Sequence, residues 1–205
     1  MSLYQTVKNT LDKDGRKMMD KQMILTASEE EGFAKTALIS TDEIAFEHEF
    51  RFFCEQNTCG NYNKNYGCPP YCGTPEEMEA KALRFENALV MQTRTPVKDV
   101  CDDKEMRKIK KIHTRMTFHM VEKLKKRGLD PDGIYGMCGP CNLCELCNMA
   151  EGKPCPHEEQ RFSCLSAYCI DVTRLAKKCD MDIQWNGDVV SFFSIYFFGE
   201  KKNLN

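Results

Sequence analysis

Cysteines near the middle of the chain carry its strongest chemical signal. Three recur at every third position, and a fourth follows after a gap of seven residues, directly before Pro156: they are Cys141, Cys144, Cys147 and Cys155. Closely spaced thiolates followed by a remote Cys-Pro are a ligand pattern of 4Fe–4S clusters. A compact turn can hold three corners of a cluster, and the returning loop supplies the fourth ligand. The spacing therefore predicts a 4Fe–4S cluster on these four thiolates.

A second group of thiols lies within residues 54–72. Its members are Cys54, Cys59, Cys68 and Cys72. Glycine and proline fix tight turns around them, and the frequent asparagines tolerate a left-handed backbone. Such turns point backbone N–H groups inward, where cluster sulfurs accept hydrogen bonds. We therefore expect a second iron–sulfur cluster here, with a structural zinc ion on the four cysteines, or unligated thiols, as the alternatives.

The remaining thiols have no partner at ligand spacing, with one exception. Cys138 precedes the main quartet by three residues and could replace Cys141, although Cys141 gives the more ferredoxin-like run. The others are interpreted as buried thiols: Cys101, Cys164, Cys169 and Cys179. Cys164 and Cys169 follow Cys155 closely enough to line the cluster pocket. His157 is either a donor to a sulfur or, as we favour, a solvated loop residue.

Composition narrows the class of protein. The chain has 205 residues, and its net charge of −2 indicates no particular class of partner. Its 13 cysteines are an odd number, so they cannot all pair in disulfides within the chain. The first residues lack the apolar segment of a signal peptide, and no apolar run approaches the roughly 18 residues of a membrane span. We expect a cytoplasmic protein without disulfides, in which many thiols indicate metal binding or thiol chemistry.

Hydrophobic periodicity and capping residues predict an α+β fold. Thr74, Pro75 and Glu77 mark a helix start, and Asp102 and Asp171 mark two more. Helices are expected at 17–31, 74–85, 102–127 and 172–178, and strands at 33–39, 44–53, 88–92, 134–137, 182–185 and 189–198. Residues 1–16 are expected to be a flexible N-terminus and residues 17–205 a single domain. In that domain we expect a small mixed sheet, helices on one side of it and two long cysteine-rich loops.

The helix expected over residues 104–127 is strongly basic. It carries ten Lys and Arg residues against two Glu, whereas residues 29–49 hold seven acids and one lysine. A solvated face of an amphipathic helix is the plainer interpretation. The alternative is a docking surface for an acidic redox partner of the ferredoxin or flavodoxin type. Nucleic acid is an unlikely partner, because Trp185 and its neighbouring aromatic residues fit a sheet core better than a stacking platform.

The two motifs CGNYNKNYGCPPYCGTPEE and GPCNLCELC…PC together resemble a family of cysteine-rich predicted metal-binding proteins common in anaerobic bacteria and archaea. The resemblance covers residues 17–198 and implies metal binding without an established reaction. Cys54, Cys59 and Cys68 match its first motif, and the four thiols from Cys141 to Cys155 match its second. In chain order, residues 54–72 are called the first cysteine segment and residues 138–162 the second. Cys72 falls where members often carry a small residue, and Cys169 falls where glycine is usual. Without Cys72, one iron of the first site would have an open position for a substrate, water or a small anion.

These observations favour a cytoplasmic iron–sulfur protein that passes electrons between soluble partners. Two alternatives belong to other classes of protein. An open iron at the first site would make the protein an enzyme, and closed tetrahedral zinc sites would make it an interaction module. The sequence contains no Ser/His/Asp arrangement, Walker loop or GxGxxG after a strand.

Overall fold

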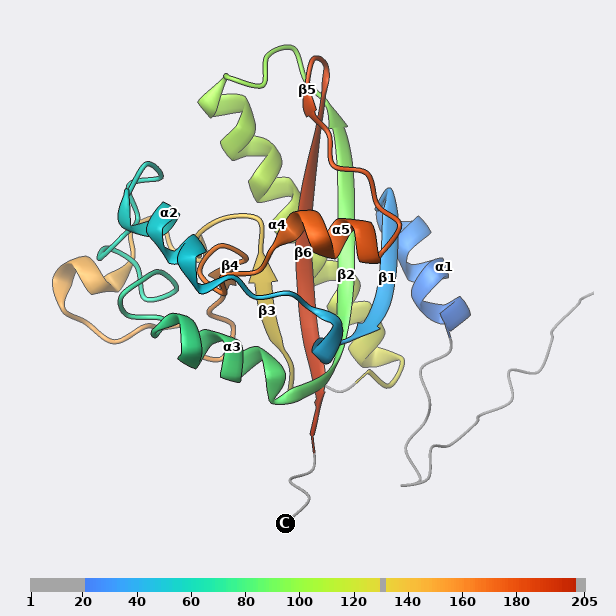
Figure 1. Cartoon of the computed structure of the whole chain (residues 1–205), viewed down its shortest axis with the longest axis horizontal. Helices are drawn as coiled ribbons and strands as arrows, with labels where there is room; N and C mark the ends of the chain where they lie inside the picture. The colour runs from blue at the N-terminus through green and yellow to red at the C-terminus, as the bar shows by residue number, and fades with distance from the viewer. Residues whose placement is uncertain (1–20, 130–131, 202–205) are drawn as a thin grey trace, which may run out of the picture.

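The structure is a computed structural model of the chain, and it describes residues 21–129 and 132–201. Within these residues, six strands form one mixed β-sheet (Figure 1). Five strands lie in the order β1-β2-β6-β3-β4, and the short strand β5 pairs with β6. Their bounds are Lys35–Ser40 for β1, Phe85–Pro96 for β2, Ile134–Met137 for β3, Ser163–Cys164 for β4, Trp185–Asn186 for β5 and Val189–Glu200 for β6.

Two long strands form the middle of this sheet. β2 and β6 are antiparallel along their lengths, from Phe85 opposite Glu200 to Pro96 opposite Val189. β1 and β3 are also antiparallel to their long neighbours. β4 runs parallel to β3, with Cys164 opposite Met137. The chain therefore leaves β3, passes through the second cysteine segment and returns to the same edge of the sheet in the same direction.

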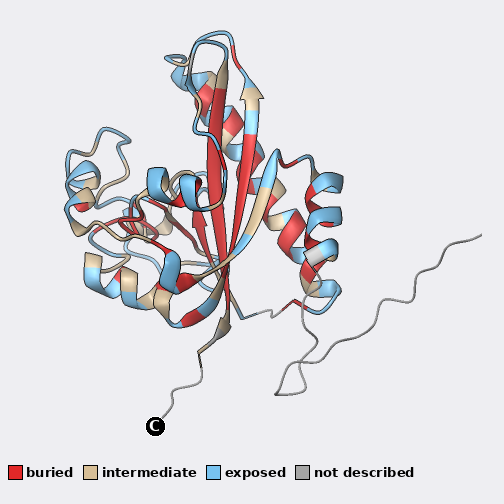
Figure 2. Ribbon diagram, turned by 45° about the vertical axis from the view of Figure 1, so that its right-hand side comes forward, coloured by how far each residue is buried: buried red, intermediate tan, exposed pale blue. Residues whose placement is uncertain are grey.

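Helices pack against both faces of the sheet. α1 (Lys21–Glu31) and α4 (Asp103–Lys126) share one apolar core with Leu89, Met91, Tyr196 and Phe198. α3 (Pro75–Leu83) and α5 (Val172–Lys178) share a second core with Ala88, Val90, Ile195 and Phe197. Successive strand residues point to opposite faces, so two cores on alternate residues mean two covered faces. Figure 2 shows the resulting band of buried residues along β2 and β6.

The α+β class expected from the sequence is confirmed, but the expectation of helices on one side is wrong. β2 is buried at consecutive positions from Ala88 to Thr93, and β6 from Val190 to Phe198. Continuous burial of this kind is typical of strands that are covered on both faces. The apolar run in β6, which only Ser191 and Ser194 interrupt, already indicated a buried strand.

Helix starts follow the capping residues. Thr74 accepts a hydrogen bond from the backbone N–H of Glu77, and the Glu77 carboxylate accepts one from the backbone of Thr74, which completes a capping box. The side chains of Asp102 and Asp171 cap α4 and α5, each by accepting hydrogen bonds from two backbone N–H groups. Gly32, with φ of 79°, follows the end of α1.

The strand expected over residues 44–53 is absent from the structure. The segment contains one short 3₁₀ turn (His48–Phe50) and the start of the helix α2 (Arg51–Glu55), and its one β-bridge joins Phe46 to Ile170. Phe50 and Phe53 are three residues apart and their rings are 5.7 Å apart, which is a helical and not a strand relation. The aromatic composition suggested a strand, but Phe52 and Phe53 are exposed. The two-residue strand β4 was not expected, because it is too short to show periodicity.

Two expectations fall partly or wholly outside the described residues. The flexible segment 1–16 lies outside them, as do the first four residues of the helix expected at 17–31. Among the helices of the described part, none combines the length and the apolar character needed to cross a membrane.

Candidate metal centres

The second cysteine segment forms the connection between β3 and β4, and its four quartet thiols converge. Cys141, Cys144, Cys147 and Cys155 all line one small cavity of about 20 Å³. Pro156 and His157 complete its wall on the returning side of the loop. His157 is exposed to solvent as well as lining this cavity. The four thiols that the sequence pattern grouped together therefore face one common space.

Short turns inside this segment bring the fourth thiol back. A 3₁₀ turn follows Cys147, and Gly152 adopts a left-handed φ of 65° that returns the chain. The side-chain amide of Asn148 donates to the carbonyl of Pro154 at 3.1 Å. This bond closes the seven-residue gap just before Cys155, so local turn chemistry sets the ligand position.

Cys138 lies outside the cavity. Its thiol faces the carbonyl of Lys110 on α4 at 3.8 Å and packs beside a small apolar core of α4 and β6. Burial raises the pKa of the Cys138 thiol to about 12. Cys141, the competing ligand, lines the cavity itself. This geometry indicates that Cys138 is a structural thiol.

The first cysteine segment gathers five thiols. The turns between α2 and α3 use left-handed residues at Asn57, Asn63 and Gly60, with φ of 54°, 56° and 74°. These turns place the thiols of residues 54, 59 and 72 within electrostatic reach of buried Cys68, whose pKa rises to about 12, chiefly through burial. The fifth thiol is Cys164 of β4, which sequence spacing left without a partner.

Cys164 contacts this group directly. Its thiol hydrogen-bonds Cys54 and lowers the Cys54 pKa to about 7, while the Cys164 pKa is raised by the same bond and by burial. Cys72 is oriented differently, with its thiol near the Gly73 carbonyl at 3.9 Å and near Arg51. Four of the five thiols suffice for a closed metal site, so one is in excess. Only the pairing of β4 with β3 brings Cys164 here, and the sequence pattern carries no sign of it.

Arg51 is a buried cation among these thiols. It is 8% exposed, and its guanidinium donates to the carbonyls of Gly73 and Ala167, at 3.0 Å each. Its Nε has no hydrogen-bond partner, and no carboxylate pairs with it among the residues that the structure describes. It does interact electrostatically with the thiols of Cys54 and Cys72. A buried charge is costly unless an opposite charge is near, so Arg51 favours the thiolate forms of Cys54 and Cys72, although burial still raises the Cys72 pKa overall.

The two cysteine segments are fastened to each other. The Asn65 amide donates to the carbonyl of Cys141 at 2.8 Å, and its oxygen accepts from the backbone N–H of Gly67 at 2.9 Å. The Tyr66 hydroxyl donates to the carbonyl of Lys153 at 2.9 Å. At Gly67 a Cβ atom would come within 2.1 Å of the Phe162 carbonyl oxygen, so only glycine fits this crossing.

None of the 13 cysteines is in a disulfide. Within the described ranges, no three or more Cys, His, Asp or Glu side chains surround a single-ion position. Cys101 is exposed, and Cys179 packs at the edge of a core, away from both groups. Cys169 adopts a left-handed φ of 59°, a backbone conformation that glycine adopts without strain.

The fold and the thiols together define a cysteine-rich α+β protein with two neighbouring candidate metal centres. Residues 37–198 match the family model described as "Predicted metal-binding protein (DUF2284)". The match covers more than half of the chain, so the chain belongs to that family and the resemblance seen in its motifs is confirmed. Searches of curated proteins and of solved structures found no significant match.

Proposed function

We propose that this protein is an iron–sulfur protein with a 4Fe–4S cluster on Cys141, Cys144, Cys147 and Cys155. The observation that carries the proposal is the single cavity lined by all four thiols. A zinc ion needs four sulfurs at about 2.3 Å from one point, whereas each thiolate of a cubane bonds a different iron. The regular C-x2-C-x2-C spacing followed by Cys155-Pro156 favours a cluster over zinc.

We further propose a second cluster at the first segment, held by Cys54, Cys59, Cys68 and Cys164. Buried Arg51 supports this assignment, because an anionic thiolate centre would balance its charge. Cys164 is preferred to Cys72 as the fourth ligand because it hydrogen-bonds Cys54, whereas Cys72 faces Gly73 and Arg51. Both centres would supply one-electron redox chemistry, with their potentials tuned by burial and by N–H groups directed at sulfur.

Electron transfer in the cytoplasm is the role that we propose for these centres, with an acidic redox protein as the partner. Lys104, Lys108, Lys111 and Arg115 are exposed and spaced by four, three and four residues, so they form one stripe on α4. Among the described residues, none of the four is in an ion pair, whereas Lys123 and Arg127 near the other end of α4 pair with Glu30. Lys110 on another face of the same helix contacts Cys138. The positive stripe itself would attract an acidic redox partner.

Anaerobic purification followed by iron, zinc and acid-labile sulfide analysis tests the proposal. About four irons and four sulfides per occupied site, with a brown absorption spectrum, would support it, and the total would count the sites. Colourless protein that carries zinc and no sulfide would contradict it and favour the structural alternative.

A pair of variants tests the fourth ligand of the first site. Cys164→Ser should lose the iron and sulfide of one site, while Cys72→Ser should keep both sites loaded. The opposite result would return Cys72 to the ligand set. Equal, full loading in both variants would show that neither thiol is a required ligand.

A further inference from the structure

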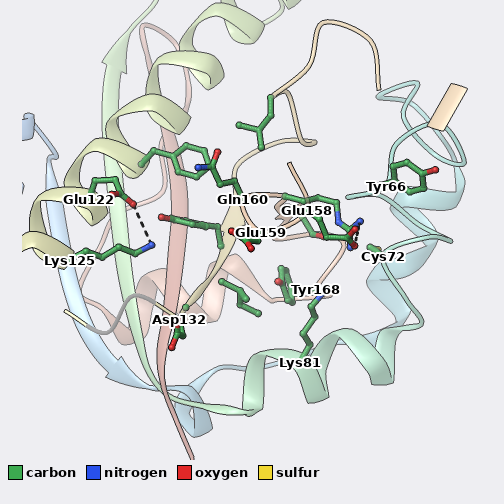
Figure 3. A pocket seen from close by; sticks show the side chains of 17 residues that line it. Tyr66, Cys72, Lys81, Glu122, Lys125, Asp132, Glu158, Glu159, Gln160 and Tyr168 are labelled. Carbon is green, nitrogen blue, oxygen red and sulfur yellow. Dashed lines mark ion pairs between the residues drawn. The ribbon is translucent and has the colours of Figure 1, made fainter. Parts of the chain in front are cut away.

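A large cavity lies between the two cysteine segments and the sheet (Figure 3). It encloses about 790 Å³, which is within the range of pockets for small molecules. Cys72 and Tyr66 reach it from the first segment, and Leu143 and Arg161 reach it from the second. Its remaining wall comes from α3, α4 and β3. The cavity therefore touches both cysteine segments, and Cys72 is the one thiol among its lining residues.

Most cationic groups in this cavity are already neutralised. Lys125 pairs with Glu122 at 3.4 Å, and Arg161 pairs with Glu158 at 3.2 Å. Lys81 is different, because it makes no hydrogen bond or ion pair with any residue that the structure describes. Burial and the nearby Arg161 lower the pKa of Lys81, and the weaker attraction of Cys72 and Glu158 does not reverse this, so the ammonium lacks a close anionic partner. An anion in the cavity would supply that partner.

A second donor lies at the same end of the cavity. Tyr168 is 2% exposed, and its hydroxyl has no hydrogen-bond partner among the described residues. Figure 3 shows Lys81 extending from α3 toward Tyr168, with Cys72 nearby, and both side chains interact electrostatically with Cys72. An ammonium and a phenol hydroxyl can each donate to one carboxylate.

The rest of the lining limits the charge and shape of the ligand. Asp132 and Glu159 add negative charge, which disfavours dianions such as phosphate. Phe118, Tyr135 and Leu143 provide an apolar wall for an uncharged body. We propose that this cavity binds a small organic monocarboxylate, which is held by Lys81 and Tyr168 and has its apolar body against that wall.

The bound carboxylate would lie close to a thiol of the first cysteine segment. Cys72 lines the cavity at the end where Lys81 and Tyr168 converge. Carboxylate binding itself depends on the cavity alone. Its communication with the first thiol group rests on the proposed function, so the two are measured separately.

Isothermal titration of the anaerobically purified protein with benzoate tests the binding proposal. Benzamide serves as the uncharged isostere and inorganic phosphate as the dianion. Benzoate should bind, with benzamide and phosphate at least about tenfold weaker, because neither matches the single charge of half-buried Lys81. Lys81→Met and Tyr168→Phe should each weaken benzoate by about tenfold or more. Lys177→Met, which changes an exposed lysine of α5, should leave binding unchanged.

Three outcomes would overturn the proposal. They are the absence of benzoate binding at millimolar concentration, equal binding of benzoate and benzamide, and equal affinity of the Lys81→Met and Lys177→Met proteins. Circular dichroism and iron content of each variant show whether its fold and metal sites are intact. A protein without iron that still binds benzoate through Lys81 would retain this inference and contradict the proposed clusters.

Discussion

The sheet and the cysteine segments are stabilised by different means. β2 and β6 bury apolar side chains on both faces, so the hydrophobic effect alone can hold this half together. The cysteine segments contain little regular structure, and polar clasps such as Arg51 and Asn65 hold them in place. A region without an apolar core depends on other bonds for its order, and metal–thiolate bonds are strong enough to supply them. The comparison separates a scaffold with its own apolar cores from a pair of loops that the proposed metal centres would order.

Removal of one ligand from the second site should produce the largest effect. We expect Cys147→Ser to lose the iron and sulfide of that site and to increase hydrogen exchange throughout residues 138–162. Amides of β2 and β6 should keep their protection, because their apolar cores do not include this thiol. Iron analysis and hydrogen-exchange mass spectrometry check both parts.

Cys101→Ser is the matched control, since Cys101 is exposed and lies outside both segments. If β2 and β6 lose as much hydrogen-exchange protection as the loop loses, the scaffold is not stable independently of the loops.

A methyl group at the crossing of the two segments should act on both sites. Gly67→Ala places Cβ against the Phe162 carbonyl oxygen, and overpacking of this kind costs about 1–3 kcal/mol. Iron content should fall at both sites, because the loops can no longer approach. Gly139→Ala is the control, because a Cβ there meets only the Lys110 side chain, at 3.6 Å. Equal iron contents in the two variants would show that the crossing of the two segments accommodates a methyl group.

Buried His113 makes the scaffold, rather than the loops, sensitive to acid. Burial lowers its pKa to about 3 from 6.5, and its Nε2 has no partner in the described part of the chain. The folded state then binds fewer protons than the unfolded state. Stability from this group is therefore present above pH 6.5 and is lost as pH falls toward 3, by up to about 1.4 kcal/mol per pH unit.

Chemical denaturation at several pH values measures this slope. His113→Gln should flatten the decline between about pH 6 and pH 4 relative to the natural chain. Parallel curves for the two proteins would mean that His113 gains a proton without unfolding the sheet.

A surface ion pair should have the smallest effect. Glu31 accepts from Lys123 and, at 2.8 Å, from His119. Burial raises its pKa, but these two partners outweigh burial and lower it overall. Its contribution is present above pH 4.5 and is lost as pH falls below that value. Glu31→Gln should cost less than about 1 kcal/mol at pH 7 and leave iron content unchanged. A larger loss would place the junction of α1 and α4 among the elements that hold the scaffold.

Sequence reasoning succeeded where local chemistry decides the structure. Thr74 with Glu77, and Asp102, marked helix starts that depend only on neighbouring backbone groups. The quartet spacing anticipated four thiols around one cavity. It failed where distant pairing decides, because β4 brings Cys164 to Cys54 across more than a hundred residues. Arg51 was overlooked for the same reason, since its burial depends on segments that fold back from far along the chain.

The place of β6 has a consequence for synthesis. β6 comes last of the described strands in chain order, yet it lies between β2 and β3 in the sheet. Until the ribosome has released it, β3 lacks its antiparallel neighbour, and the loop that begins at β3 has no fixed base. Domains acquire their tertiary contacts only once the required segments have emerged. Metal acquisition should therefore follow translation of β6. Until then, the nascent chain would hold its thirteen thiols without bound metal.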